Sequence, residues 1–328
     1  MIKFYLTKLY QLFYQIIFLF KYFSKFTTIL FLFFVNCDNH NKNNFKVAEI
    51  ERFEKSFFEY DLDSINNLIS DYPFLFPTQF SIQDWINIRE DKLRNEIFSE
   101  TIEIYQDQYL EQNLSKLYHN LNNFFLDFRY PRSITLNNGV DYDYRVVYSD
   151  DILLISLDCF LGESRFYSGI PTYQKSKMNK NYLFRDIAEK IVFNFVKYPK
   201  ERQFVNRAIY YGKIMYFMEN ALDFEISKVF KYDNEQINWL NKNEKLIWTK
   251  LIENDMLFST SNVYYENLIL ENPYSKFGTQ LDYQIPPMVG KWIGYKIVES
   301  YIKTNNKNIV DVLEMDEYEL YLDSNFNP

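Results

Sequence analysis

Histidine is almost absent from this chain, which has only His40 and His119 among 328 residues. A zinc site that hydrolyses peptides usually needs two histidines one helical turn apart, as in His-Glu-x-x-His, and a third ligand. That motif does not occur, and a single histidine in the folded part cannot supply the set. We therefore expect no metal site and interpret His119 as a partly exposed helix residue.

Other catalytic signatures are missing as well. A Ser-His-Asp or Cys-His device would have to use His119 alone, and no Gly-x-Ser-x-Gly motif accompanies it. The seven glycines include no loop of the kind that cradles phosphates, so we expect no cofactor. The scarcity of glycine and of proline, nine residues, favours long helices over a turn-rich β-sandwich.

Basic residues are the minority, and their distribution is uneven. Residues 1–36 hold four of the 36 lysines and arginines and no acid, so the rest carries 32 bases against 44 acids, a net charge of −12. Sequence-independent nucleic-acid binding needs clustered basic residues that displace counterions. We therefore expect no nucleic-acid partner.

The N-terminus, by contrast, is rich in apolar residues. Residues 9–20 are apolar apart from two glutamines, Lys21 and Lys25 interrupt, and residues 26–35 form a second apolar stretch. Ten helical residues span about 15 Å, roughly half of a hydrocarbon core. Such a stretch after basic residues is more typical of the core of an export signal than of a stable membrane span.

The apolar stretch ends at a cysteine in the sequence Phe34-Val35-Asn36-Cys37. Bacterial lipoprotein signals end in a short box before a cysteine that is acylated and becomes the first mature residue. The bulk of Phe34 and the presence of Asn36 make this box imperfect, and an uncleaved anchor with an incidental cysteine is the alternative. Both interpretations tether residues 38–328 to a membrane outside the cytoplasm, facing the periplasm. If Cys37 is modified, Cys159 has no partner for a disulfide.

Three segments follow from these patterns: a signal peptide at 1–36, a polar tether at 37–44 and a single domain at 45–328. We predict helices where apolar residues recur at helical spacing, namely around 50–58, twice within 91–128, and in 187–196, 203–219, 233–248 and 289–301. Short β-branched or aliphatic runs at 133–136, 144–148 and 152–157 predict a small sheet of three or four strands, with the last run central. The expected fold class is α+β, mostly α-helical.

Two further local features are predicted from residue types. The segment Asp71-Tyr-Pro-Phe-Leu-Phe-Pro77 has two prolines around aromatic residues and suggests a rigid extended loop. Gly290 and Gly294 lie one turn apart on the last helix, which would let a neighbouring backbone approach closely. Asp233 or Asn234 is a plausible N-cap for the helix that carries Trp239 and Trp248.

Candidate binding residues come from one strand end and three dense stretches. Asp158 ends the apolar strand, where it would either cap a turn or line a cleft. The stretches 210–217, 241–248 and 287–295 mix aromatic residues with lysine and small or amide residues, which is common both in clefts and at ordinary helix contacts. The candidates for a shared cleft are Asp158, Tyr211, Lys213, Glu244, Trp248 and Trp292. Asp158 with Glu244 is also the one carboxylate pair to test for glycoside hydrolysis.

Several of these stretches together resemble a known family. DYPFLFP, LLISLDCFLG, IYYGKIMYF, NWLNKNEKLIW, ENPYSKFG and PPMVGKWIGYKIVESY, in this order after a lipoprotein-type N-terminus, are similar to the gliding-motility lipoprotein GldB family of Bacteroidetes. The resemblance covers nearly all of 45–328. It implies an exported, acylated lipoprotein required for gliding and for the associated type IX secretion machinery, with other envelope proteins as partners and no enzymatic activity.

More distantly, the layout resembles zinc peptidases that have a small sheet before the metal-binding helix. That resemblance implies a zincin-like scaffold, with the metal helix at Asp186–Lys190 and a glutamate ligand near Tyr211. Here Asp186-Ile-Ala-Glu-Lys190 has no histidine and Tyr211 stands where an acid would be needed. The expectation is therefore a non-catalytic gliding component, or alternatively a metal-free binding module that grips a peptide or glycan.

Overall fold

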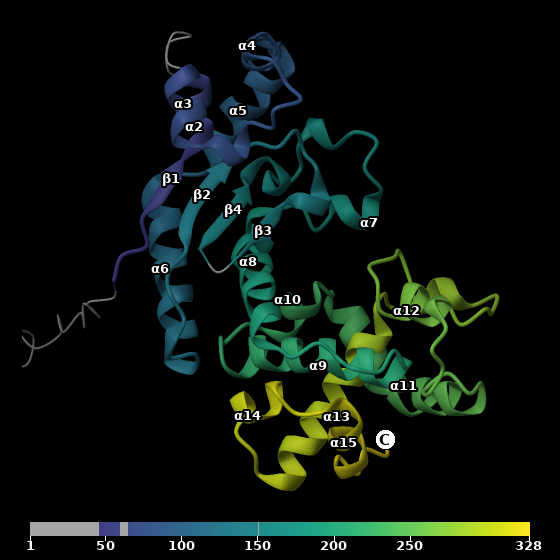
Figure 1. Cartoon of the computed structure of the whole chain (residues 1–328). Coiled ribbons are helices and arrows are strands. Elements are labelled where there is room, and N and C mark those ends of the chain that lie inside the picture. The colour runs from purple at the N-terminus through teal and green to yellow at the C-terminus, as the bar shows by residue number, and fades with distance from the viewer. Residues whose placement is uncertain (1–45, 60–64, 150) are drawn as a thin grey trace, which may run out of the picture. The chain divides into compact units, whose positions relative to one another are not determined.

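A four-stranded sheet organises the N-terminal half of the computed structural model, which describes residues 46–59, 65–149 and 151–328. The strands are β1 (Ile50–Arg52), β2 (Arg132–Leu136), β3 (Val146–Tyr148) and β4 (Ile152–Ser156), in the order β1-β2-β4-β3 (Figure 1). β1, β2 and β4 are parallel, whereas β3 is antiparallel to β4. The predicted sheet is confirmed, and the apolar strand β4 is central as expected.

Helices make up most of the described chain, which confirms the α+β, mostly helical class. Those before β2 are α2 (Phe53–Glu59), α3 (Ile65–Asp71), α4 (Ile82–Glu90), α5 (Lys92–Ile104) and α6 (Asp107–Phe124). Those after β4 are α7 (Thr172–Lys175), α8 (Leu183–Val192), α9 (Phe204–Asn220), α10 (Ile226–Phe230), α11 (Asn234–Glu253), α12 (Asn262–Leu268), α13 (Val289–Asn305), α14 (Ile309–Leu313) and α15 (Glu317–Asp323). Residues 46–328 form one compact unit. The predicted signal peptide, tether and acylated Cys37 lie outside the described residues.

The start of the unit differs from its sequence prediction. Helical spacing suggested that Ile50 begins a helix, but Ile50 lies in β1 and the helix α2 begins at Phe53. β1 pairs with β2, whose residues follow about eighty positions later, so no local pattern reveals it. The sheet is joined to α6 by two buried hydrogen bonds: Ala48 N donates to Ser115 Oγ at 2.8 Å, and the hydroxyls of Tyr118 and Ser133 lie 2.7 Å apart.

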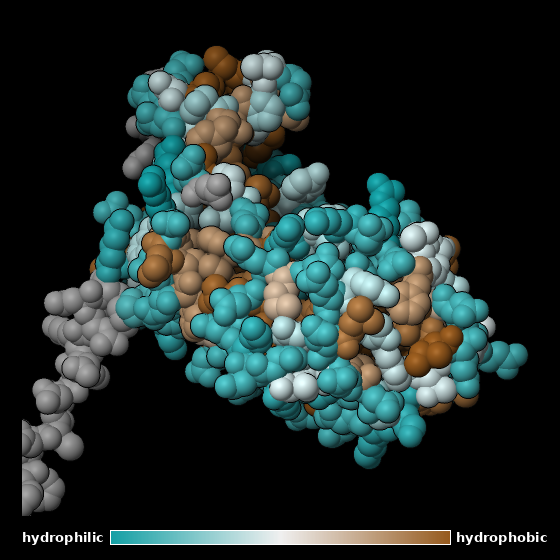
Figure 2. Space-filling model, turned by 60° about the horizontal axis from the view of Figure 1, so that its bottom comes forward, coloured by the Kyte–Doolittle hydropathy of each residue, from teal (hydrophilic) through white to brown (hydrophobic). Residues whose placement is uncertain are grey.

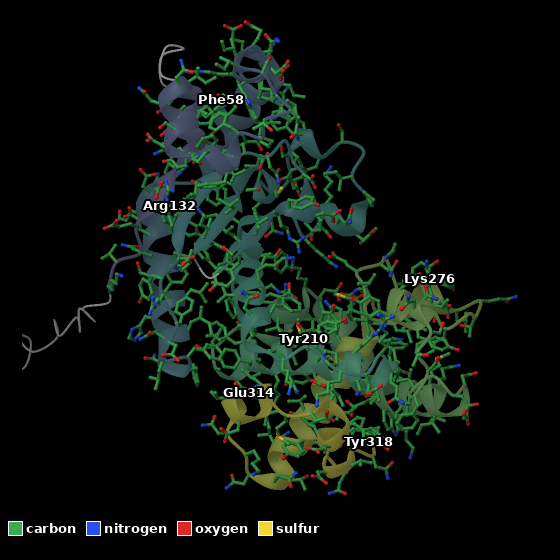
Figure 3. The ribbon with its side chains drawn as sticks, viewed as in Figure 1. Phe58, Arg132, Tyr210, Lys276, Glu314 and Tyr318 are labelled. Atoms are coloured by element: carbon green, nitrogen blue, oxygen red, sulfur yellow. The ribbon has the colours of Figure 1, made fainter. Side chains whose placement is uncertain are left out.

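Helices α2 to α5 enclose a small aromatic core of their own. Phe57 and Phe76 are buried there against Trp85, and Phe58 stacks on Phe98 of α5 with ring centroids 4.9 Å apart (Figure 3). The proline-flanked segment contributes Phe76, but it forms a short 3₁₀ turn, Pro73–Leu75, where an extended loop was expected. The two prolines therefore flank a turn that contributes aromatic contacts to this core, and the segment is not extended.

The C-terminal half is built on the pair α9 and α13. A Cβ on Gly294 would lie 1.8 Å from the Ala208 carbonyl oxygen, and one on Gly212 would lie 2.1 Å from the Gly294 carbonyl carbon. Only glycine at both positions allows the backbones to come this close, which confirms the close approach predicted at Gly294. At Gly290 a Cβ would also crowd Leu268 and Ile269 of the α12 end.

Capping and surface patterns complete the unit. Asp233 caps α11 through a capping box with Gln236, as predicted. The face in Figure 2 is largely hydrophilic, with apolar residues scattered among polar ones. Among the described helices, none combines the length and the apolar character that a membrane crossing requires.

Candidate functional site

A buried network of charges surrounds the first turns of α8. The carboxylate of Asp186 accepts from Arg145 Nε at 2.6 Å, from Arg185 Nη1 at 3.0 Å and from Lys231 Nζ at 2.8 Å. Arg185 also binds both carboxylate oxygens of Glu189, at 2.5 and 3.1 Å, and donates to the Val229 carbonyl. Arg145, which immediately precedes β3, and Lys231, which immediately follows α10, are thus joined to α8 in one cluster, which we call the α8 network.

The electrostatics of the α8 network favour fully charged side chains. Burial by itself would raise the pKa of Asp186, but the charges of Lys231, Arg145 and Arg185 hold that pKa far below its ordinary value. Burial likewise opposes ionisation of Glu189, whereas Arg185 and Lys291 keep its pKa low. Burial lowers the pKa of Lys231 to about 8 in spite of its contact with Asp186. Both carboxylates are therefore kept ionised and accept hydrogen bonds from the neighbouring cations.

More charged groups border the network on the side of α12 and α13. Lys177 pairs with Glu271 at 3.0 Å, and the Nζ atom of Lys291 lies 4.7 Å from the centre of the Tyr211 ring. Burial opposes ionisation of Glu271, but Lys177 and Lys231 keep its pKa below the ordinary value. The buried hydroxyl of Tyr142 has no hydrogen-bond partner in the structure, although Arg145 lies over its ring at 4.1 Å.

The α8 network does not fit the zinc that the distant peptidase resemblance implies. The two acids of α8 are bound by guanidinium and ammonium groups, which would repel a cation. Tyr211 shares a hydrogen bond of 2.8 Å with Tyr265, so no acid stands at the third position either. Within the described ranges, no three His, Cys, Asp or Glu residues gather as metal ligands would. The charged side chains of the α8 network thus form ion pairs with one another and do not make up a set of metal ligands.

Asp158, the first candidate cleft residue, acts as the cap of a turn. Its fully buried carboxylate accepts from the backbone N–H groups of Asn138, Gly139 and Val140 at 3.2, 2.9 and 2.8 Å. Burial raises the pKa of Asp158 to about 6, although these three donors oppose the shift. Of the two roles considered for this acid, the structure shows the turn cap.

Three other candidates are held in the interior. Trp292 and Lys213 are almost completely buried, and Lys213 Nζ donates to Glu317 at 2.8 Å and to the Met315 carbonyl. Trp248 is buried against Tyr321 and Phe326. Their mixture of aromatic and lysine residues reflects helix packing and the attachment of α15.

The remaining candidates, Tyr211 and Glu244, are partly buried. Tyr211 on α9 contacts Tyr265 and Lys291, whereas Glu244 on α11 faces Lys296 at 3.9 Å. The six candidates therefore do not line one cleft. Asp158 follows β4 and Glu244 lies on α11, elements that are well apart in Figure 1, so the structure does not bring this carboxylate pair together.

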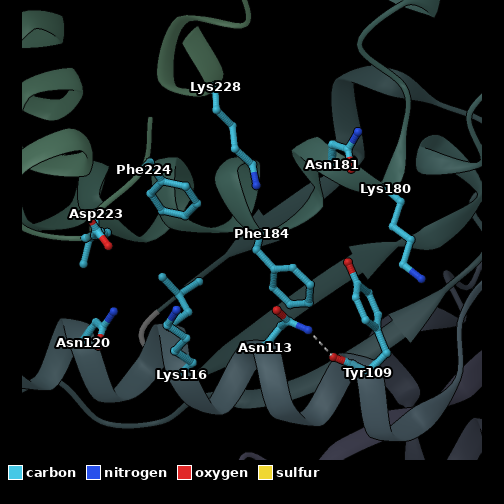
Figure 4. A pocket seen from close by; sticks show the side chains of 12 residues that line it. Tyr109, Asn113, Lys116, Asn120, Lys180, Asn181, Phe184, Asp223, Phe224 and Lys228 are labelled. Carbon is cyan, nitrogen blue, oxygen red and sulfur yellow. Dashed lines mark hydrogen bonds between the residues drawn. The ribbon is translucent and has the colours of Figure 1, made fainter. Parts of the chain in front are cut away.

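A pocket of about 250 Å³ lies on the other side of the α8 N-terminus, between α6, α8 and α10 (Figure 4). We call it the lysine pocket, because Lys116, Lys180 and Lys228 line it. Lys228 extends from α10 into the space between Phe224 and Phe184 (Figure 4). Lys180 makes one hydrogen bond, to the Ile104 carbonyl at 3.3 Å.

The other walls of the lysine pocket are aromatic rings and amides. Tyr109 and Phe184 meet edge to face, with centroids 5.7 Å apart. Asn113 donates to the Tyr109 carbonyl at 2.8 Å, which leaves its side-chain oxygen available (Figure 4). Asn120 and Asn181 also line the pocket. Asp223, at the rim, is the one acid among the lining residues.

Sequence reasoning missed both clusters, for different reasons. It singled out Asp186 and Glu189 on α8, but Arg145 and Lys231, which bind Asp186, come from segments some forty residues away in either direction. The pocket residues form no motif, since lysine and asparagine are ordinary surface residues. The three lysines are distant from one another in a strongly acidic sequence. The local positive charge that they create therefore becomes apparent only in the folded structure.

The chain is thus an α+β protein that contains a helix-centred ion-pair network where a metal site was considered. Compared with known families, it matches the family described as gliding motility protein GldB over residues 37–328. The chain therefore belongs to the GldB family, whose name marks its members as gliding-motility lipoproteins. No curated protein and no solved structure matches it significantly.

Proposed function

We propose that this protein is a membrane-anchored, non-catalytic component of the gliding apparatus and of the associated type IX secretion machinery. The observation that carries the proposal is the family match, which begins at Cys37. Cys37 is also the residue that the N-terminal pattern marks for acylation. The lipid would hold the folded unit at the envelope membrane, facing the periplasm, where other envelope proteins are its partners.

Two features of the site support a non-catalytic role. The carboxylates of the α8 network are occupied by Arg145, Arg185 and Lys231, so neither acid is available as a general base. Asp158 is occupied by three backbone donors. We interpret the unit as a degenerate zincin-like scaffold, supported by the antiparallel edge strand β3 beside a helix that carries acids at 186 and 189.

Deleting the gene and complementing the strain tests the proposed function. We expect the deletion strain to lose gliding and secretion, and the wild-type gene to restore both. A deletion strain that glides and secretes normally would contradict the proposal.

The anchor is tested separately with Cys37→Ala, because acylation requires the thiol. A radioactive fatty acid should label the wild-type protein and leave the variant unlabelled. A matched Cys159→Ala variant, which removes the buried cysteine of the described unit, should be labelled like the wild type. Equal labelling of Cys37→Ala would overturn the lipid anchor while leaving the role in gliding open to the complementation test.

A further inference from the structure

We propose that the lysine pocket binds an acidic sugar, a pyranose ring that carries a carboxylate, through Lys116 and Lys228. The proposal adds a ligand-binding role to the proposed function and rests on that function only for the biological setting. Three independent features of the pocket point to this ligand: its charge, its aromatic and amide walls, and its size.

The charge of the lysine pocket is opposite to that of the chain. Three lysines face one acid there, whereas the whole protein carries a net charge of −8. Lys116 makes no hydrogen bond or ion pair with the described chain, and Lys228 is partly buried beside Phe224, 5.7 Å from the ring centre. Partial burial lowers the pKa of Lys228, because its ammonium is poorly solvated. The charge of Glu225 opposes this shift, but Glu225 does not line the pocket, so a bound carboxylate would supply a counter-charge inside it.

The walls of the pocket suit a sugar ring. Phe224 and Phe184 present ring faces and edges on either side of Lys228 (Figure 4), and such surfaces pack against the C–H groups of a pyranose. The amides of Asn113, Asn120 and Asn181 can both donate to and accept from hydroxyl groups. Leu117 and Leu222 are buried and also line the pocket.

The size and the frame of the pocket argue against an extended peptide. Its volume of about 250 Å³ is below the range of roughly 300–1,000 Å³ for drug-sized ligands, and so suits one ring. The lining residues come from α6, α8, α10 and the turns beside them, so the pocket contains no strand edge to which a peptide backbone could pair. A single carboxylated sugar unit, free or at the end of a glycan, meets these limits.

Titration of the full-length protein in detergent with digalacturonate, followed by calorimetry, tests the proposal. Saturable binding is expected, and it should weaken as salt is raised, because exposed charges are screened within about 10 Å at 0.1 M salt. Cellobiose supplies a neutral sugar, glucose 6-phosphate a phosphorylated one and the dipeptide Glu-Glu an acidic peptide. All three should bind more weakly than digalacturonate.

Two variants move the affinity in opposite directions. Lys116→Gln with Lys228→Gln should weaken digalacturonate binding about five- to thirtyfold, which corresponds to two partly exposed ion pairs. Asp223→Asn removes the rim acid and should tighten binding about two- to fivefold. Asp223 has φ +60°, a conformation that asparagine tolerates well, so this variant should fold.

The matched control is Lys242→Gln with Lys245→Gln, two exposed lysines of α11 outside the pocket. It makes the same change in net charge and should leave affinity unchanged. Absence of digalacturonate binding, or equal loss in the control, would overturn the proposal. Equal binding of cellobiose would refute the role of charge, and tighter binding of glucose 6-phosphate or Glu-Glu would assign the pocket to another ligand. None of these outcomes bears on gliding, so the proposed function is judged separately.

Discussion

The α8 network and the lysine pocket each contain lysine and aspartate, and they lie on two sides of the same elements. In α8, Phe184 lines the pocket while its neighbour Arg185 is buried in the network. At α10, Lys228 reaches into the pocket, whereas Lys231 pairs with Asp186 at 2.8 Å. Three residues along the chain therefore separate a buried lysine that is paired with a carboxylate from a partly buried lysine whose only nearby acid, Glu225, forms no ion pair with it within the described chain.

The difference shows what each charge can do. A buried ion pair that satisfies all of its donors stabilises a geometry but has no capacity left for a ligand, and losing one partner leaves a buried charge uncompensated. A partly exposed lysine without a partner costs little to keep in water and can gain a counter-ion. We therefore expect substitutions in the network to change stability and substitutions in the pocket to change binding.

The largest effect is expected for Arg185→Met. This change removes the guanidinium that binds Glu189, Asp186 and the Val229 carbonyl, and it leaves the Glu189 carboxylate without its main partner. The free energy of unfolding should fall by about 3–5 kcal/mol, as measured by urea denaturation. Lys190→Gln, on the same helix, is the control and should lie within about 0.5 kcal/mol of the wild type. A loss below about 1 kcal/mol for Arg185→Met would show that the network is not a buried structural unit.

A somewhat smaller loss is expected for Lys213→Gln. Lys213 is completely buried and binds Glu317 and the Met315 carbonyl, so it attaches α15 to α9. Burial lowers the pKa of Lys213, although Glu317 opposes the shift. Glutamine can keep one hydrogen bond, and we expect a loss of about 2–3 kcal/mol. A Lys213→Gln variant that is as stable as the wild type but has a lower affinity for a ligand of the protein would instead assign Lys213 to a binding site.

The pH dependence of stability should be the next effect in size. Asp186 and Glu189 have folded pKa values below the ordinary 3.8 and 4.5, so below pH 4.5 the unfolded state binds more protons than the folded state. The stability they contribute is therefore fully present above about pH 4.5 and is lost as the pH falls. Urea midpoints between about pH 3 and pH 4.5 should show this fall, because Asp158, whose pKa is raised to about 6, acts in the opposite direction at higher pH, and Glu189→Gln should make the fall shallower. A midpoint that stays constant down to pH 3 would contradict the assignment.

Much of the fold could be predicted from local patterns. Helical spacing within 91–128 gave α5 and α6, short β-branched or aliphatic runs gave β2 to β4, and Asp233 marked the start of α11. β1 was missed because its three residues are held in place by contacts distant in sequence, above all by pairing with β2. Gly212 looked isolated, and only the crossing of α9 and α13 shows why no side chain fits there.

The site was much harder to predict, because its signals are not local. Lysine beside tryptophan or tyrosine suggested a cleft, but Lys213, Trp248 and Trp292 serve the interior contacts of helices. Conversely, no sequence pattern marked Lys116 and Lys228, which come together only because α6 and α10 lie around one pocket. Whether a lysine is paired depends on residues distant in sequence, and composition cannot supply that information.

The most direct test of the comparison pairs two chemically identical substitutions, Asp186→Asn in the network and Asp223→Asn at the pocket rim. Urea denaturation of both full-length variants measures the free energy of unfolding under the same conditions. Asp186→Asn should lose about 3–5 kcal/mol because three cations lose their shared acceptor, and Asp223→Asn should stay within about 0.5 kcal/mol of the wild type. Equal losses, or a larger loss for Asp223→Asn, would contradict the division between a structural network and an open pocket.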